Sequence, residues 1–124
     1  MDSDERDLAR LLGLGRMVIG ATMLLMPRQA VKRYMGEEEP SWTAAMAMRG
    51  LGARDIALGT GLMVALEEDG DVARWLEAGA VSDAGDFLAT LSNFRELPSL
   101  RRFLWLLTAG SATYLGLKLA GALD

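Results

Sequence analysis

Long apolar stretches alternate with short polar connections along the whole chain. Four stretches stand out, over residues 8–26, 42–66, 72–91 and 100–123. At about 1.5 Å per residue, a helix of each would cross a hydrocarbon layer of roughly 30 Å. The connections PRQAVKRYMGEEEP, EEDGD and NFRELP hold the helix breakers and much of the charge. Apolar residues nowhere alternate with a period of two, so the pattern predicts one all-α domain over residues 1–124, a four-helix bundle running up-down-up-down.

Such a bundle can lie in water or in a membrane, and the second stretch helps to separate the two. A soluble bundle helix needs a broad face of Lys, Glu, Gln and Asn, and none of these occurs between Ser41 and Leu66. Its charges, Arg49, Arg54 and Asp55, point to different sides at about 100° per residue. The same charges interrupt the stretch, so a soluble bundle stays open as the alternative. We favour an integral membrane protein, because glycine and alanine at helical spacing suit close packing in lipid.

The composition removes several classes of function. Hydrophobic residues make up 51% of the 124 residues, and the chain contains no histidine and no cysteine. Imidazole and thiolate metal sites, histidine acid-base catalysis and disulfides are therefore excluded. The net charge of −4 and the lack of a basic cluster argue against nucleic acid as a partner. We expect no cofactor; the expected partners are the lipid bilayer and, through glycine-lined faces, other membrane proteins or further copies of the chain.

In the membrane interpretation, charged residues from three stretches lie at a similar depth. Arg16 is close to the middle of the first stretch, Arg54 and Asp55 to the middle of the second, and Asp83 to the middle of the third. A lone charge at the bilayer centre costs about 2.5 to 3.5 kcal/mol on insertion scales. These side chains therefore need partners from other helices.

Helical spacing predicts which side of each stretch faces the bundle. Small and polar residues recur at intervals of three or four and form one stripe per helix. The stripes are Ala9, Gly13, Arg16, Gly20 and Met23; Ala45, Met48, Gly52, Asp55, Gly59 and Leu62; Trp75, Gly79, Ser82, Asp83, Asp86 and Thr90; and Leu106, Gly110, Thr113, Leu117 and Ala120. We expect arginines to pair with aspartates across these stripes. The candidate cluster is Arg16, Arg49, Arg54, Asp55, Glu77, Asp83 and Asp86. Arg49 and Glu77 are expected nearer opposite membrane boundaries.

The basic residues predict an orientation in the membrane. The first and third connections and their flanks carry Arg28, Lys32, Arg33, Arg95, Arg101 and Arg102. Because basic loops stay in the cytoplasm, both termini are predicted to lie outside a cell membrane that the chain crosses four times. Residues 27–40 are expected to form a short interfacial helix and a turn, with Tyr34 and Met35 near the headgroups and Trp42 as an anchor. An ordinary solvated loop is the alternative.

The segment RGLGARDIALGTG, residues 49–61, also invites comparison with nucleotide-binding loops. A dinucleotide fingerprint needs a third glycine at set spacing after a strand, and a phosphate loop ends in Gly-Lys followed by Ser or Thr. Neither pattern is present. We interpret the segment as part of a lipid-embedded helix.

Two motifs in these stretches resemble a known group of proteins. The second stretch holds RGLGARDIALGTGL, in which Arg54-Asp55 is followed by Leu58-Gly59, and the third holds AGAVSDAGDFLATL. With four short spans, the chain resembles the small, mostly uncharacterised bacterial membrane proteins of the DoxX-like group over roughly residues 8–120. The resemblance implies a four-helix integral membrane fold and, for some relatives, association with membrane oxidoreductase complexes. It brings no catalytic residues, and the absence of cysteine rules out a thiol-based role.

Three functions remain open. The first is an accessory or assembly subunit of a membrane complex, in which the charged centre holds the bundle together. The second is a transporter for a small solute or a proton-linked carrier, because ionisable residues inside a membrane are functional candidates. The third and least favoured is an enzyme acting on a lipid or quinone, with Asp83 and Asp86 as acid and base. We therefore expect a protein that is not an enzyme.

Overall fold

The computed structural model describes residues 1–92 and 99–123, with the side chains of 99–106 excepted. Every regular element in these residues is helical, and they contain no strand, so the predicted all-α class is confirmed. The elements are α1 (Ser3–Leu25), α2 (Pro27–Ala30), the π-helical turn η1 (Val31–Met35), α3 (Trp42–Glu67), α4 (Val72–Ser92) and α5 (Ser99–Gly121).

The helix ends follow from local sequence. Asp2 caps α1, because its carboxylate accepts a hydrogen bond from the Glu5 amide (2.8 Å) while the Glu5 carboxylate accepts one from the Asp2 amide (3.0 Å). This acidic capping box starts α1 at Ser3, five residues before the apolar stretch used to predict it. Ser41 caps α3 through a hydrogen bond from the Ala44 amide to its hydroxyl (3.1 Å).

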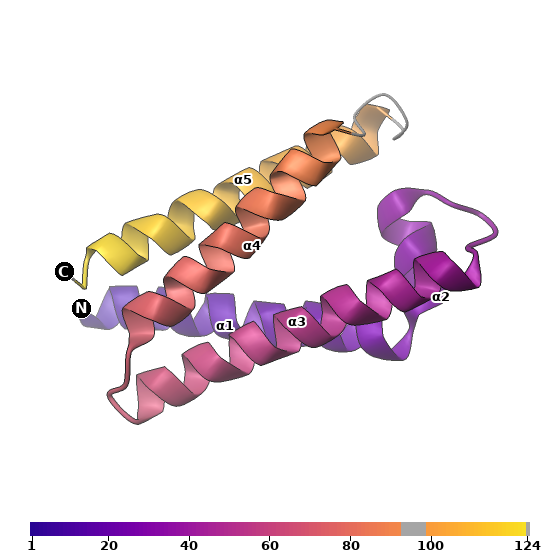
Figure 1. Ribbon diagram of the computed structural model, residues 1–124. Helices are drawn as coiled ribbons and strands as arrows, with labels where there is room; N and C mark the ends of the chain where they lie inside the picture. Colours follow the sequence, from indigo (N-terminus) through magenta and orange to yellow (C-terminus); the bar gives the residue numbers. More distant parts are fainter. Residues whose placement is uncertain (93–98, 124) are drawn as a thin grey trace.

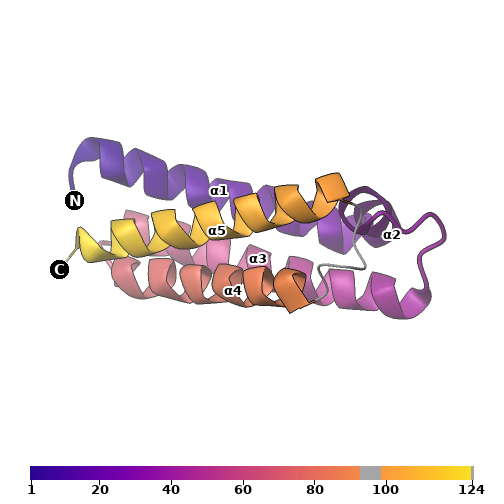
Figure 2. The same ribbon diagram turned by 90° about the horizontal axis from the view of Figure 1, so that it is seen from above.

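The four long helices alternate in direction, and both termini lie at the same end of the molecule (Figures 1 and 2). Two antiparallel pairs make up the fold: α1 packs along α3, and α4 packs along α5. The pairs lie closest beside the termini and the α3–α4 turn, and they diverge toward the other end (Figure 1). We call the first end the closed end.

Glycine sets the distance between α1 and α3. A Cβ atom on Gly52 would lie 2.5 Å from the carbonyl oxygen of Gly20, and one on Gly20 would lie 2.6 Å from that of Gly52. A Cβ on Gly59 would lie 2.5 Å from the Gly13 carbonyl oxygen. Real Cβ atoms do not approach so closely, so the two backbones touch only because these positions are glycine. The predicted stripes of both helices face this contact.

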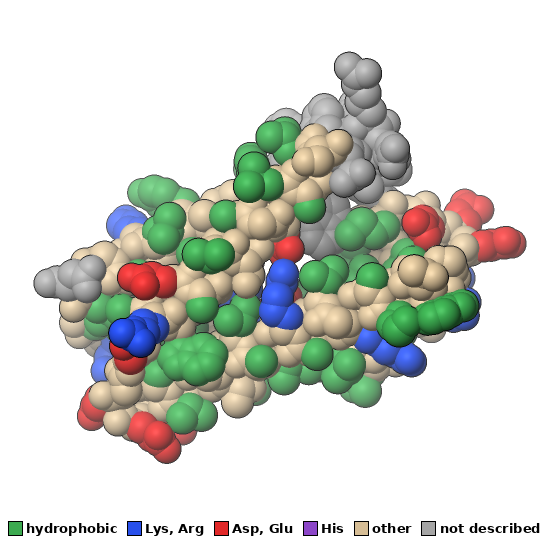
Figure 3. All heavy atoms as spheres, in the orientation of Figure 1, with side chains coloured by type: hydrophobic (Ala, Val, Ile, Leu, Met, Phe, Trp, Pro, Cys, Tyr) green, Lys and Arg blue, Asp and Glu red, His purple; other side chains and the backbone are tan. Residues whose placement is uncertain are grey.

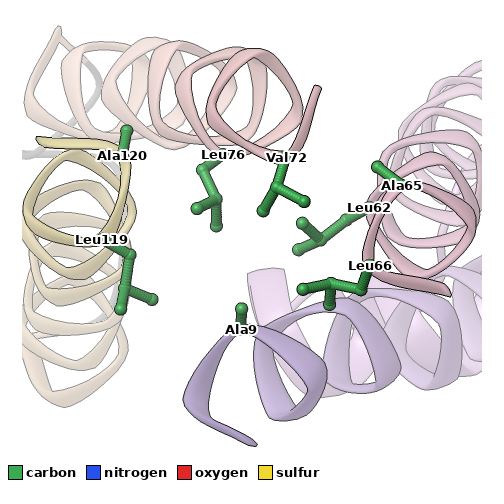
Figure 4. Packing of buried hydrophobic residues seen from close by; sticks show 8 residues of the cluster. All are labelled: Ala9, Leu62, Ala65, Leu66, Val72, Leu76, Leu119 and Ala120. Carbon is green, nitrogen blue, oxygen red and sulfur yellow. The ribbon is translucent and has the colours of Figure 1, made fainter. Parts of the chain in front are cut away.

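A hydrophobic cluster fastens the two pairs together at the closed end (Figure 4). All four long helices contribute to it, with Ala9, Leu62, Ala65, Leu66, Val72, Leu76, Leu119 and Ala120. Arg6 reinforces it by donating a hydrogen bond to the Leu66 carbonyl oxygen at the end of α3 (2.6 Å).

A smaller cluster joins α1 to the first connection. It contains Met23, Ala30, Val31 and Met48, and Tyr34 and Met35 pack against it. Both side chains are partly buried on the protein, in the π-helical turn, and their approach to lipid headgroups stays a prediction. Gly36, with φ of 76°, then ends the turn in the left-handed conformation that glycine adopts without strain.

Large apolar side chains cover much of the outside. Exposed examples come from every long helix and include Leu11, Val18, Leu25, Met46, Val64, Val81, Leu88, Leu107 and Tyr114. Among the helices searched in the described part of the chain, α1 alone is long and apolar enough to count as a candidate membrane span, with a mean hydropathy of 1.6. One such helix supports membrane association weakly, because core helices of soluble proteins and signal sequences have the same length and composition.

A paired ionic network as the candidate functional site

Five charged residues from three helices meet near the middle of the bundle. Arg16 comes from α1, Arg54 and Asp55 from α3, and Asp83 and Asp86 from α4. We call these five residues the charge network. Each lies within about one turn of the centre of its helix, so their common level follows from the lengths of the helices and their alternating direction.

The buried half of the network joins α1 to the other two helices. The Arg16 guanidinium forms a two-pronged ion pair with Asp83: Nη1 donates to Oδ1 at 3.1 Å, and Nη2 donates to Oδ2. The same Nη1 lies 3.6 Å from Oδ1 of Asp55. Two parallel N–H to oxygen bonds fix the planar groups of Arg16 and Asp83 relative to each other, which a lysine could not do.

The second half joins α3 to α4. Arg54 holds Asp86 with two hydrogen bonds, from Nη1 to Oδ1 at 3.1 Å and from Nη2 to Oδ2 at 2.9 Å. It also donates to Oδ1 of its neighbour Asp55, from Nε at 3.3 Å and from Nη2 at 3.1 Å. Acid and base therefore alternate through the network, in the order Asp83, Arg16, Asp55, Arg54 and Asp86.

The two halves of the network differ in burial. The side chains of Arg16, Asp55 and Asp83 are 15%, 11% and 10% exposed, whereas those of Arg54 and Asp86 are 31% and 32% exposed. Acidic and basic side chains are visible at the bottom of the gap between α3 and α4 in the space-filling view (Figure 3). The network thus has a dry end at Asp83 and Arg16 and an open end at Arg54 and Asp86, between α3 and α4.

Glycine on α4 makes room for the arginine of α1. A Cβ atom on Gly79 would lie 2.8 Å from Nη2 of Arg16. Because Gly79 stands about one helical turn before Asp83, the guanidinium crosses the α4 backbone before it reaches the carboxylate. Within the described residues, every buried side-chain nitrogen or oxygen atom has a hydrogen-bond partner.

The network contains three aspartates and two arginines, so its formal charge is −1 when all are ionised. Each aspartate nevertheless has an arginine partner. Such an arrangement can hold helices together, and its open end can exchange a proton or an ion with the surroundings. It leaves no carboxylate without a basic partner to act alone as an acid or base.

Two of the seven predicted cluster residues stand apart from the network. Arg49 and Glu77 are exposed, and neither pairs with a residue of the network. The reason is angular: Arg49 is about 140° around α3 from Arg54, and Glu77 lies on a face of α4 that turns away from α1. Arg49 lies in the first half of α3 and Glu77 in the first half of α4, and their closeness to opposite membrane boundaries stays a prediction.

The facing predicted for the last two helices needs correction. Leu117 was expected inside but is 53% exposed, whereas Trp75 is 37% exposed and its ring lies against Gly61 of α3. The buried face of α4 is centred on Leu76, Gly79 and Ala80 instead, because α4 packs against α5 as well as meeting α3. Leu106 lies outside the residues whose side chains are described.

The fold and the network together define a class: an all-helical bundle with ionic pairs inside and many apolar side chains outside. Comparisons of the chain with protein-family models, with curated proteins and with solved structures found no match. Function must therefore be inferred from the residues and their arrangement.

Proposed function

We propose that the chain is a four-span integral protein of a bacterial cell membrane, of the DoxX-like kind, and that it serves as an accessory or assembly subunit of a membrane complex. One observation carries the membrane part of the proposal: large apolar side chains cover the outside of the bundle at the depth where paired charges lie inside it. Arg16 and Asp83 are paired inside the bundle, while Leu11, Val18 and Val81 are each about two-thirds exposed. Water disfavours such a surface, and lipid accepts it.

Helix length and charge depth support the same location. The four long helices contain 21 to 26 residues, enough for about 30 Å of hydrocarbon at about 1.5 Å per residue. Any 18-residue window of α3 holds more than two charged residues, which keeps α3 from qualifying as a span by composition. Pairing of Arg54 and Asp55 inside the bundle removes much of that penalty.

Membrane partition tests this part. The expressed chain should remain in the membrane pellet after extraction at alkaline pH and enter solution with a mild neutral detergent. It should aggregate when the detergent is removed. A chain that stays folded and dispersed in plain buffer would refute the membrane location.

The orientation is proposed with both termini outside, since Arg28, Lys32 and Arg33 lie in the first connection. The absence of cysteine makes a direct test possible. Ser3→Cys should react with a membrane-impermeant maleimide in intact cells. Glu38→Cys should react only after the membrane is opened. The reverse labelling pattern would invert the proposed topology.

The role as a subunit rests on the outward face of α3. Exposed residues at helical spacing there are small or of moderate size: Gly50, Ala53, Ala57, Thr60 and Val64. Small side chains let a second helix approach closely, which is how helices associate in lipid. The long helices themselves provide nearly all of the described structure, so a partner would meet the chain through such a face.

Site-specific photo-crosslinking in native membranes tests that role. A photoreactive residue at Ala57 should give a discrete adduct with a defined protein, whereas one at Val18, on the bulky outward face of α1, should label lipid. Equal adduct patterns at the two positions, or lipid adducts alone at Ala57, would contradict a partner on α3.

Proton-linked transport is the second candidate, favoured by the excess carboxylate and the partly exposed Arg54–Asp86 pair. Proteoliposomes with a pH-sensitive dye inside would show a proton flux that Asp86→Asn abolishes. Flux at the level of empty liposomes would remove this candidate. An enzyme that uses Asp83 and Asp86 as acid and base is disfavoured, because an arginine holds each of them with two hydrogen bonds.

A further inference from the structure

A second basic site lies away from the charge network, at the end of the molecule opposite the termini. A pocket of about 430 Å³ opens here between the α1–α2 turn and the start of α3. Its lining includes Arg28 and Gln29 from α2, and Trp42, Met46 and Arg49 from α3. The contact between α2 and α3 thus brings two arginines, separated by 21 positions in the sequence, to one pocket.

The two guanidinium groups are available to a ligand. Arg28 donates one hydrogen bond from Nη1 to the Pro40 carbonyl oxygen (3.2 Å), which positions it and leaves Nη2 for another acceptor. Arg49 is exposed and forms no hydrogen bond or ion pair with another described residue. The pocket lining contains no carboxylate. The acidic run Glu37 to Glu39 is exposed in the following loop and forms no ion pair with either arginine. The pocket is therefore positively charged.

Apolar groups flank these cations on the outer side. Trp42 is 66% exposed and Met46 is 51% exposed. In a four-span protein, Trp42 at the start of α3 lies at the level of the lipid headgroups, where indole rings concentrate. Arg49 begins seven residues deeper, about 10 Å along the helix, and its long side chain reaches back toward that level. A ligand that satisfies both regions is anionic at one end and apolar at the other.

We propose that this pocket binds the phosphate of an anionic phospholipid, with the two guanidinium groups on its oxygens and the acyl chains along Trp42 and Met46. The planar guanidinium donates two parallel hydrogen bonds to phosphate, and basic pockets beside membrane helices hold such headgroups. The inference that the bound phosphate belongs to a lipid rests on the proposed membrane location. Recognition of phosphate by the arginines is independent of it.

Thermal unfolding of the purified protein in a neutral detergent tests the site. Three probes are added separately: phosphatidylglycerol, phosphatidylcholine with the same acyl chains, and inorganic phosphate. Phosphatidylglycerol should raise the unfolding midpoint of the native chain, because a ligand that binds the folded state stabilises it. The other two probes should leave the midpoint unchanged.

Single substitutions show whether the pocket is responsible. Arg49→Gln and Arg28→Gln should each weaken the response to phosphatidylglycerol about tenfold in lipid concentration, the usual effect of losing one charge-assisted hydrogen bond. Arg74→Gln, a control that removes an exposed arginine at the far end, should respond as the native chain does. Arg49→Gln should unfold at the native midpoint without lipid, and Arg28→Gln slightly below it because it loses the hydrogen bond to Pro40, so each response is measured from the variant's own lipid-free midpoint.

The outcomes separate the possible failures. Equal responses of Arg49→Gln and Arg74→Gln would overturn the site, since phosphatidylglycerol would then act on surface charge in general. If inorganic phosphate stabilises the native chain but not Arg49→Gln, the pocket binds free phosphate, and the claim that its ligand is a lipid fails. If the chain proves soluble without detergent, the membrane location fails, and a phosphate titration of the native chain and Arg49→Gln in buffer still decides whether the pocket holds the anion.

Discussion

Two contacts made by α1 are built in opposite ways. Against α3, α1 places glycine on glycine, so that the backbones touch at Gly20 and Gly52 and again at Gly13 and Gly59. Against α4, α1 makes few backbone contacts, and the connection is a single long side chain, Arg16, that reaches Asp83. Close packing holds one helix pair together, and an ion pair spans the space between the pairs.

The two contacts should therefore respond differently to mutation. A glycine contact gains dispersion energy only while nothing larger than hydrogen stands at the interface, so its tolerance for added atoms is small. An ion pair tolerates changes in distance better, but removal of one partner leaves an uncompensated charge inside the bundle. Added volume should therefore damage the α1–α3 contact, and loss of charge should damage the α1–α4 contact.

Loss of Arg16 should have the largest effect. Arg16→Met removes the two-pronged partner of Asp83 and one partner of Asp55, and both carboxylates are largely buried. Breaking a buried pair in this way costs about 3 to 5 kcal/mol. We expect unfolding in mild detergent at a much lower temperature or denaturant concentration than for the native protein. Arg49→Met, which deletes an exposed arginine outside the network, is the control and should unfold nearly as the native chain does.

A methyl group at the glycine contact should have an intermediate effect. Gly52→Ala places a Cβ atom 2.5 Å from the Gly20 carbonyl oxygen, so the helices must separate, at a cost of about 1 to 3 kcal/mol. Gly50→Ala, two residues away, has no atom within 4 Å of the new Cβ and should be neutral or slightly stabilising. Comparison of their denaturation midpoints isolates the contact. Equal midpoints would show that α1 and α3 do not touch at this residue.

Gly79→Ala should have the smallest effect. It adds volume at the contact between α1 and α4, which an ion pair holds. The added Cβ would lie 2.8 Å from the Arg16 guanidinium, which can shift because it ends a flexible side chain. We expect a loss of about 1 kcal/mol, measured by the same unfolding experiment. The effect should disappear in the Arg16→Met background, where the guanidinium is gone. Gly85→Ala meets nothing within 4 Å and serves as the control.

Much of the fold could be predicted from the sequence because it depends on local properties. Helix positions follow from apolar length and breakers such as Pro27, and the facing of α1 and α3 follows from glycine spacing, since a helix that packs on one neighbour has one inward face. The facing of α4 was harder to predict. It meets two neighbours, and the resulting rotation centres its buried face on Leu76, Gly79 and Ala80.

The candidate site shows the same limit. Depth along a helix placed Arg16, Arg54, Asp55, Asp83 and Asp86 at one level, and angular position left several pairings possible. Which carboxylate each arginine holds depends on how the helix pairs tilt and diverge, a property of the whole bundle. The pocket at Arg28 and Arg49 depends on the path of the turn after α1, and spacing in the sequence does not reveal it.

A double-mutant cycle on Arg16 and Asp83 tests the central claim most directly, because it measures the coupling between one pair of charges inside the bundle. The four proteins are the native chain, Arg16→Met, Asp83→Leu and the double variant, and their free energies of unfolding are compared in the same detergent. If the ion pair spans the interior, each single change is severe and the double variant recovers much of the loss, with a coupling of about 2 kcal/mol or more. Additive losses, with no recovery in the double variant, would contradict the account.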